Sequence, residues 1–340
     1  MASQNNYNFT IDASVKIVER IASNANLIIT FLGIVNNAIC IGVFSQKKLL
    51  QRKFNIYLLV LTIFEMIFCT VLFADYIYSK FNTHGIFLHN LNKYMRILIS
   101  FLVEASDSYI GILTAILSLD RLYAIKYPLE INDFVTHRHV RSLIAVPLIA
   151  LIILKTSSFI LCEHHLNNDF QIIYCSIVSP LLFNALPFIS VLFLNSILVK
   201  EIISYYRNQE GLKKNLTEGD ISLELLDMKS SSFLVRKFCK KEETHSKKSH
   251  YVVILLTNIW SILTIIPFYY FISCFTLINI NSFSTCFDSK TVIIGQMVAS
   301  IFFNSNHCIN FFIYLCFYDD FRYSLRDFFI YFKESKVINV

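Results

Sequence analysis

Residues 101–123 read FLVEASDSYIGILTAILSLDRLY, a mostly apolar stretch that carries acids inside it and ends close to an Asp-Arg pair. About 20 mostly apolar residues in a helix span the hydrocarbon layer of a bilayer. The chain has seven such runs, and the quoted stretch belongs to the third. They cover residues 26–45, 54–79, 92–123, 141–161, 176–206, 249–275 and 289–317. The sequence therefore predicts an all-α membrane protein with a seven-transmembrane helix bundle.

The composition of the 340 residues agrees with a membrane protein. Only 16% of the residues are charged, whereas about a quarter are charged in a soluble globular chain. The net charge of +6 would favour nucleic acid only if the basic residues gathered on one face. The nine cysteines follow no zinc spacing, and loop histidines are more often solvated than metal-bound. We therefore expect no nucleic-acid partner and no metal site.

The basic residues instead follow the topology. With the N-terminus outside, 23 of the 30 Lys and Arg residues fall in inner segments, six fall in outer segments, and Lys155 lies within a span. Lys and Arg prefer the cytoplasmic side. We therefore predict a multi-pass plasma-membrane protein with an extracellular N-terminus at 1–25, a transmembrane domain at 26–317 with a cytoplasmic loop at 207–248, and a tail at 318–340. Asn8 is then a glycosylation acceptor on the extracellular side.

The start of the tail, YDDFRYSLRDFFIYFK, has apolar residues at helical spacing. Phe321, Leu325, Phe328 and Phe329 alternate with Arg322 and Arg326. This pattern predicts a short amphipathic eighth helix lying along the inner membrane surface.

Polar residues inside the predicted spans are costly and mark functional or paired groups. Their depth follows from the helical rise, which puts Asp107 roughly 21 Å from Arg121. Two layers result. The middle layer contains Asn37, Glu65, Asn306 and Asn310, and the outer layer contains Asp75, Glu104 and Asp107. Lys155 is the only basic residue that could pair with the outer layer.

Several motifs resemble those of rhodopsin-like G-protein-coupled receptors, in order and on the expected spans. DRLYAIKYPL resembles the DRY…P segment with Asp120, Arg121 and Pro128, although Leu122 replaces the usual Tyr. FNSNHCINFFIY resembles the NPxxY signature with Asn310 and Tyr314. Asn37, Glu65 (where Asp is usual), Pro187 and Pro267 resemble the markers of spans one, two, five and six. The resemblance covers residues 27–332 and is similar in detail to invertebrate FMRFamide and related neuropeptide receptors.

The chain also departs from this family pattern. Ile265 stands where the sixth-span Trp is usual, and Arg96 stands where the third-span Cys is usual. Cys175 therefore lacks its customary partner. Cys162 could pair with Cys175 and Cys274 with Cys286, and the alternative for both pairs is free thiols.

The ligand is predicted from the outer layer of acids. Val103 and Asn304 stand where amine receptors carry Asp and opsins carry Lys, so both classes are disfavoured. Glu104 and Asp107 are three residues apart and share roughly one helix face. A peptide ending in Arg-Phe-amide would supply a cation to these carboxylates. The alternative is that Lys155 neutralises one of the acids and that the others face water or lipid headgroups. Tyr269 and the neighbouring aromatics are interpreted as packing or lipid-facing residues.

The resemblance implies a receptor that binds an extracellular peptide or small molecule and activates a heterotrimeric G protein through Arg121, Asp120 and Pro128, with Tyr314 holding the open form. It implies no cofactor beyond a sodium ion near Glu65, for which a plain hydrogen-bonded network is an equal alternative. Lys247 and Lys248 take the place of the acid that locks the arginine in many relatives, so we expect appreciable basal signalling. A chemosensory receptor is the alternative within the class, and a transporter or channel is the alternative outside it. No catalytic motif indicates an enzyme.

Overall fold

The computed structural model describes residues 13–81, 89–127, 136–163, 183, 186–219, 252–274 and 289–338. The long helices in these ranges are α1 (Ala13–Phe44), α3 (Lys53–Phe81), α4 (His89–Lys126), α6 (His137–Glu163), α8 (Leu186–Gly219), the helix Val252–Cys274, α10 (Ser289–Phe317) and α11 (Asp319–Ile338), with the short α2 (Lys47–Leu50) between α1 and α3. Six of them are long and apolar enough to cross a membrane, and α8 is the remaining long helix of the bundle. The predicted all-α fold class is confirmed.

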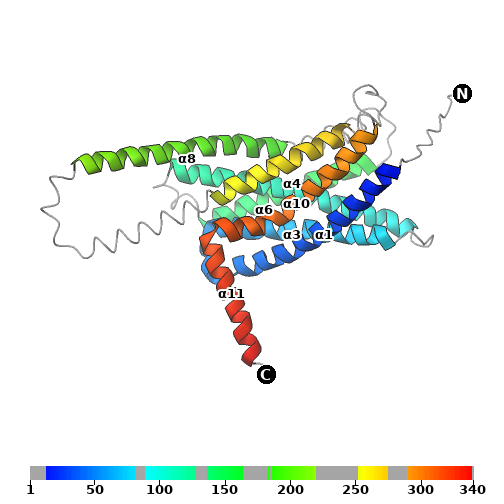
Figure 1. Ribbon diagram of the computed structural model, residues 1–340, viewed down its shortest axis with the longest axis horizontal. Helices are drawn as coiled ribbons and strands as arrows, with labels where there is room; N and C mark the ends of the chain where they lie inside the picture. Colours follow the sequence, from blue (N-terminus) through cyan, green and yellow to red (C-terminus); the bar gives the residue numbers. More distant parts are fainter. Residues whose placement is uncertain are drawn as a thin grey trace.

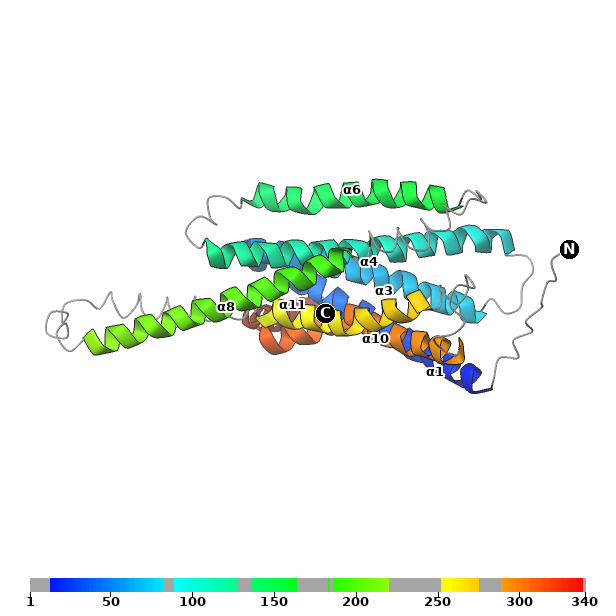
Figure 2. The ribbon, with the colours of Figure 1, turned by 90° about the horizontal axis from the view of Figure 1, so that it is seen from above.

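The helices other than α2 and α11 run along one long axis (Figure 1). α1 packs against α3 and α10, and α4 packs against α3, α6 and α8. α6 lies at one edge of the bundle beside α4 (Figure 2). We call the end of the bundle next to α11 the α11 end, and the opposite end, where α1 begins, the far end.

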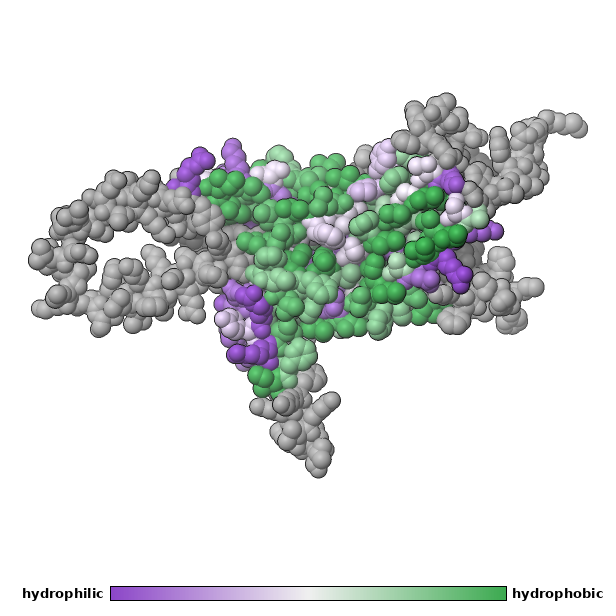
Figure 3. All heavy atoms as spheres, viewed as in Figure 1, coloured by the Kyte–Doolittle hydropathy of each residue, from purple (hydrophilic) through white to green (hydrophobic). Residues whose placement is uncertain are grey.

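The surface is consistent with a lipid environment. On the face seen in Figure 3, apolar residues cover the middle of the bundle and hydrophilic residues gather toward its two ends. Large apolar side chains stand exposed on several helices, among them Ile28, Val146, Ile153, Phe193 and Leu263. Exposed apolar side chains over the length of a span are expected where the solvent is hydrocarbon.

Helix ends differ from the predicted spans at two places. α1 begins at Ala13 rather than near residue 26, and α8 continues to Gly219, into the range predicted as a loop. Residues 13–25 and 207–219 are rich in Ala, Glu, Lys, Arg, Gln and Leu, which favour helices in water. An apolar run therefore marks where a helix crosses the membrane, but it does not mark where the helix stops.

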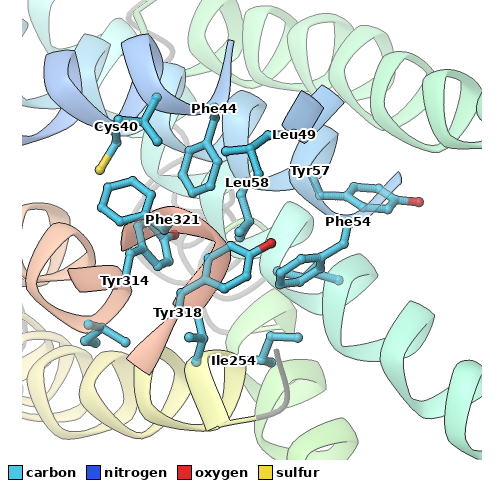
Figure 4. Close-up of a cluster of buried hydrophobic side chains, with 14 of the residues drawn as sticks. Cys40, Phe44, Leu49, Phe54, Tyr57, Leu58, Ile254, Tyr314, Tyr318 and Phe321 are labelled. Atoms are coloured by element: carbon cyan, nitrogen blue, oxygen red, sulfur yellow. The ribbon is translucent and has the colours of Figure 1, made fainter. Parts of the chain in front are cut away.

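The α11 end is filled by what we call the aromatic cluster, which consists of Phe44, Phe54, Tyr57, Tyr314, Tyr318 and Phe321 (Figure 4). Each of these side chains is at most 2% exposed. The ring of Phe44 lies 5.3 Å from those of Tyr314 and Phe321, in the range of favourable aromatic pairs. The cluster thereby joins α1, α3, α10 and α11.

Tyr318 anchors this cluster through a polar atom. Its hydroxyl donates to Asn55 Oδ1 at 2.6 Å. Burial raises the pKa of Tyr318 to about 12, so the hydroxyl stays protonated and keeps donating at neutral pH. The predicted amphipathic helix is present as α11, with Phe321 buried, Leu325 and Phe328 packed against the cluster, and Phe329 exposed.

Two glycines allow close helix contacts. A Cβ at Gly33 of α1 would lie 2.5 Å from Sγ of Cys69 on α3, and one at Gly42 would lie 2.7 Å from the Phe328 ring of α11. Helices in lipid associate through such close packing, because hydrocarbon provides no hydrophobic drive between them.

Candidate ligand and switch sites

Asp107 of α4 is a part-buried acid in the far half of the bundle, with its side chain 15% exposed. It accepts a hydrogen bond from the Tyr269 hydroxyl of the helix Val252–Cys274 at 3.1 Å. Its other carboxylate oxygen lies 3.8 Å from Nε2 of His307 on α10. His307 is fully buried between the rings of Phe68 and Phe303. Asp107 therefore links three helices, and the interpretation of Tyr269 as a packing or lipid-facing residue was wrong.

A cavity of about 40 Å³ lies beside this carboxylate. Its polar lining is Asp107, Ser108, Thr114, Ser261, Tyr269 and Asn306, and its apolar lining includes Ile110, Phe183, Pro187, Val191 and Ile265. A few water molecules fit this volume, whereas a drug-sized ligand needs hundreds of cubic ångströms. The structure thus shows a largely apolar chamber with a carboxylate in its wall, and a larger ligand requires the helices to separate.

Glu104 has different surroundings from Asp107. Its carboxylate pairs with Nζ of Lys155 on α6 at 3.3 Å, and its side chain is 56% exposed whereas that of Lys155 is 5% exposed. The Lys155 ammonium also lies 4.7 Å from the centre of the Phe183 ring. Lys155 therefore neutralises one acid of the predicted pair. Asp75 is half-buried on α3 and does not line the cavity beside Asp107.

The predicted middle layer forms hydrogen bonds between helices. Asn310 of α10 donates to Glu65 of α3, Asn37 of α1 donates to the backbone carbonyl of His307 at 2.9 Å, and Ser261 donates to Asn306 at 2.8 Å. The network ties α1, α3 and the helix Val252–Cys274 to α10. Glu65 therefore bonds to Asn310, while Asn37 and Asn306 bond to other groups of the same layer.

Two buried oxygens of this layer have no partner among the described residues, Oε2 of Glu65 and Oδ1 of Asn37. Oxygen atoms of this kind suit a hard cation or a water molecule. Within the described ranges, no group of three or more His, Cys, Asp or Glu side chains gathers as a metal site. The sodium ion near Glu65 stays a prediction.

Asp120 and Arg121 pair with each other at the α11 end of α4, at 2.8 Å. The guanidinium lies 4.4 Å from the centre of the Phe54 ring, a cation–π distance. Arg121 Nε and the buried hydroxyls of Tyr57 and Tyr314 have no partner among the described residues. The arginine is thus held within its own helix and against α3.

Sequence reasoning missed a second polar group near Arg121. Ser118 of α4, Asn195 of α8 and Asn258 of the helix Val252–Cys274 are all buried and hydrogen-bonded to one another. The signal was present, since both asparagines are amides inside apolar runs. We call these three residues the Ser-Asn-Asn group.

Other predicted residues are placed only in part. Pro187 lines the cavity from the first turn of α8, and Pro267 lies within the helix Val252–Cys274. Cys274 is half-buried at the end of that helix. Pro128, Cys175, Cys286, Asn8 and the side chain of Cys162 lie outside the described residues. Both disulfide pairs and the glycosylation site therefore stay predictions.

The helices that are long and apolar enough to cross a membrane define a multi-pass membrane protein, which has the Asp107 carboxylate beside a cavity in its far half and an Asp-Arg pair at its α11 end. The family described as 7 transmembrane receptor (rhodopsin family) matches residues 36–314. The chain therefore belongs to the rhodopsin family of seven-transmembrane receptors, which are not enzymes. A comparison with curated proteins found no match.

Proposed function

We propose that the protein is a plasma-membrane receptor whose N-terminus is extracellular, which binds its ligand in the far half of the bundle and activates a heterotrimeric G protein at the α11 end. The observation that carries the ligand site is Asp107. A carboxylate in a largely apolar chamber needs a cationic partner or a proton. The cavity beside it gives a ligand group access to this oxygen once the helices separate.

The ligand is an extracellular peptide ending in Arg-Phe-amide. Its guanidinium forms a charge-assisted bond with Asp107, and its aromatic ring packs in the apolar lining contributed by Pro187, Val191 and Ile265. Glu104 contributes as the exposed member of an ion pair at the rim, and Asp75 adds to the negative potential of the entrance. A chemosensory ligand of smaller size is the second candidate, and the limited volume of the chamber favours it.

The G protein engages Arg121, Pro128 and the basic segments around them. Arg121 is bound to Asp120 and Phe54 in this structure, so activation requires the helices at the α11 end to separate and expose it. Tyr314, whose buried hydroxyl has no partner among the described residues, supports the open form.

The test is G-protein dissociation in cells that express the chain, challenged with Arg-Phe-amide peptides and with amines. We expect a peptide response that is lost in Arg121→Ala and that needs about 10-fold to 150-fold more peptide in Asp107→Asn. An amine response would replace the peptide assignment. Ligand-independent ion current or solute uptake in lipid vesicles, without a G-protein response, would show a transporter or channel instead.

A further inference from the structure

The Ser-Asn-Asn group connects three helices through hydrogen bonds between side chains. Asn258 Nδ2 donates to Asn195 Oδ1 at 2.6 Å and to Ser118 Oγ at 3.1 Å, and Ser118 Oγ lies 3.2 Å from Asn195 Oδ1. The three residues are at most 5% exposed. Asn258 is the shared donor, so the helix Val252–Cys274 attaches to α4 and α8 through one amide.

This attachment matters because the surrounding contacts are apolar. Leu117, Leu198 and Ile254, each within four residues of a member of the group, are buried apolar side chains of one core cluster. Apolar contacts between helices can be exchanged for lipid contacts at little cost, whereas a polar bond between helices is lost on separation. The group therefore sets the position of the helix more strongly than its neighbours do.

The same group is incompletely satisfied in this arrangement. Asn195 Nδ2 and Asn258 Oδ1 are buried and have no partner among the described residues, as is also true of Arg121 Nε three residues beyond Ser118. A buried polar atom without a partner costs about 1–3 kcal/mol. Separation of the helices would let water reach these atoms, so the cost of breaking the bonds is partly offset. The bonds gained in the closed arrangement and the hydration gained in the open one therefore partly cancel. A contact that switches between two states needs such small differences in free energy, whereas a fixed structural contact does not.

We propose that the Ser-Asn-Asn group is a neutral clamp that holds the helix Val252–Cys274 closed against α4 and α8, and that its release exposes Arg121. The sequence predicts basal signalling because Lys247 and Lys248 replace the acid that locks the arginine in many relatives. The clamp restrains the helix without that acid, so it lowers the basal signalling. That Arg121 then engages a G protein rests on the proposed function.

The far end of the same helix supplies the connection to the ligand site. Tyr269 follows Asn258 by eleven residues, which is roughly 16 Å along the helix, and its hydroxyl is bound to Asp107. The helix is therefore tied to α4 at two points, one in the ligand chamber and one at the clamp. A ligand cation that takes the Asp107 carboxylate competes with the Tyr269 hydroxyl and loosens the first tie, which leaves the clamp as the remaining restraint.

The clamp is tested by removing its members from the full-length receptor. Asn258→Leu and Asn195→Leu break the bonds at similar side-chain volume, and Ser118→Ala removes only the hydroxyl, which keeps the test valid if a leucine variant folds poorly. Thr257→Val is the matched control, because the hydroxyl that it removes bonds to the carbonyls of Val253 and Ile254 in the same helix, so the clamp stays intact. Spin labels at Lys126 and Val252, with reactive cysteines replaced by serine, report the separation of the helix from α4, and basal G-protein dissociation is recorded in parallel.

We expect Asn258→Leu to raise the separated fraction about threefold to tenfold, the range for losing one or two such bonds in a membrane. Ser118→Ala raises it less, and Asn195→Leu combined with Asn258→Leu adds little to the single change because the residues act as a unit. An unchanged label distance in Asn258→Leu and Ser118→Ala, or an equal rise in Thr257→Val, would overturn the clamp. A rise in the separated fraction without any G-protein dissociation would uphold the clamp and refute the proposed function.

Discussion

The two ends of this bundle are stabilised in different ways. At the α11 end, large rings from α1, α3, α10 and α11 fill the interior (Figure 4), and the main polar contacts are the Tyr318–Asn55 bond, the Asp120–Arg121 pair and the Ser-Asn-Asn group. The far half instead has an acid and a phenol in the wall of a cavity, with the imidazole of His307 lying 3.8 Å from the acid. Tight packing fixes a single arrangement, whereas a chamber with polar side chains in its wall leaves those side chains available to a ligand. The comparison predicts that substitutions in the aromatic cluster of the α11 end chiefly change stability, and that substitutions in the far half chiefly change the ligand response.

The largest effect is expected from Phe321→Ala in the aromatic cluster. The side chain is fully buried and contacts Phe44 and Tyr314, and its removal leaves a cavity that costs about 3 kcal/mol. Thermal unfolding of the purified receptor, without ligand, measures the loss. Phe329→Ala is the control, because this ring is on the same helix but 55% exposed. Equal losses in the two variants would show that the cluster does not stabilise this end.

A smaller effect on stability and a large effect on ligand response are expected from Asp107→Asn. The change keeps the side-chain volume but removes the charge, and losing a charge-assisted bond of about 1.5–3 kcal/mol lowers potency about 10-fold to 150-fold. The measurement is the half-maximal activating concentration of an Arg-Phe-amide peptide, chosen because it activates the unmodified receptor and compared between that receptor and the variant.

The matched control for this prediction is Glu104→Gln combined with Lys155→Met, which removes the neighbouring ion pair as a unit. We expect this control to shift potency less than Asp107→Asn. A larger shift in the control would move the cation site from Asp107 to the rim.

How much of this arrangement could be predicted depends on what the apolar runs encode. Depth along a helix follows from sequence position, so the sequence predicts one layer for Glu65 and Asn310, and the structure has a hydrogen bond between them. Rotation about the helix axis is not encoded in the same way, because lipid-facing and core-facing positions are both apolar and the helical pattern is weak. Glu104 and Asp107 were therefore assigned to one face, although the first pairs with α6 and the second contacts α10 and Tyr269.

The Ser-Asn-Asn group escaped prediction for the same reason. Ser118, Asn195 and Asn258 lie on three different helices, and nothing in the local sequence shows that their side chains turn toward one point. Once the helices are assembled, their burial and mutual bonds make the group evident.

A moderate effect is expected from Tyr269→Phe. The hydroxyl donates to Asp107 and competes with a ligand cation for this carboxylate, so its loss should raise potency by about threefold to tenfold, the value of one hydrogen bond. Peptide concentration–response curves measure it, with Tyr270→Phe as the control because that neighbouring side chain is 50% exposed. A loss of potency would indicate that the hydroxyl helps the carboxylate to hold its charge and does not compete with the ligand.

The smallest effect is expected where charge, rather than packing, joins α3 to α11. Arg52 pairs with Asp320, and their side chains are 45% and 21% exposed. Exposed ion pairs contribute about 0–1 kcal/mol, so Asp320→Asn should change the unfolding temperature by at most about a third of the Phe321→Ala loss. Asp320 and Phe321 are adjacent in sequence and both connect α11 to the bundle. The ratio of the two losses in unfolding temperature therefore compares charge with packing directly. An Asp320→Asn loss as large as that of Phe321→Ala would mean that α11 is held by its ion pair, and that the two ends of the molecule do not differ as the packing indicates.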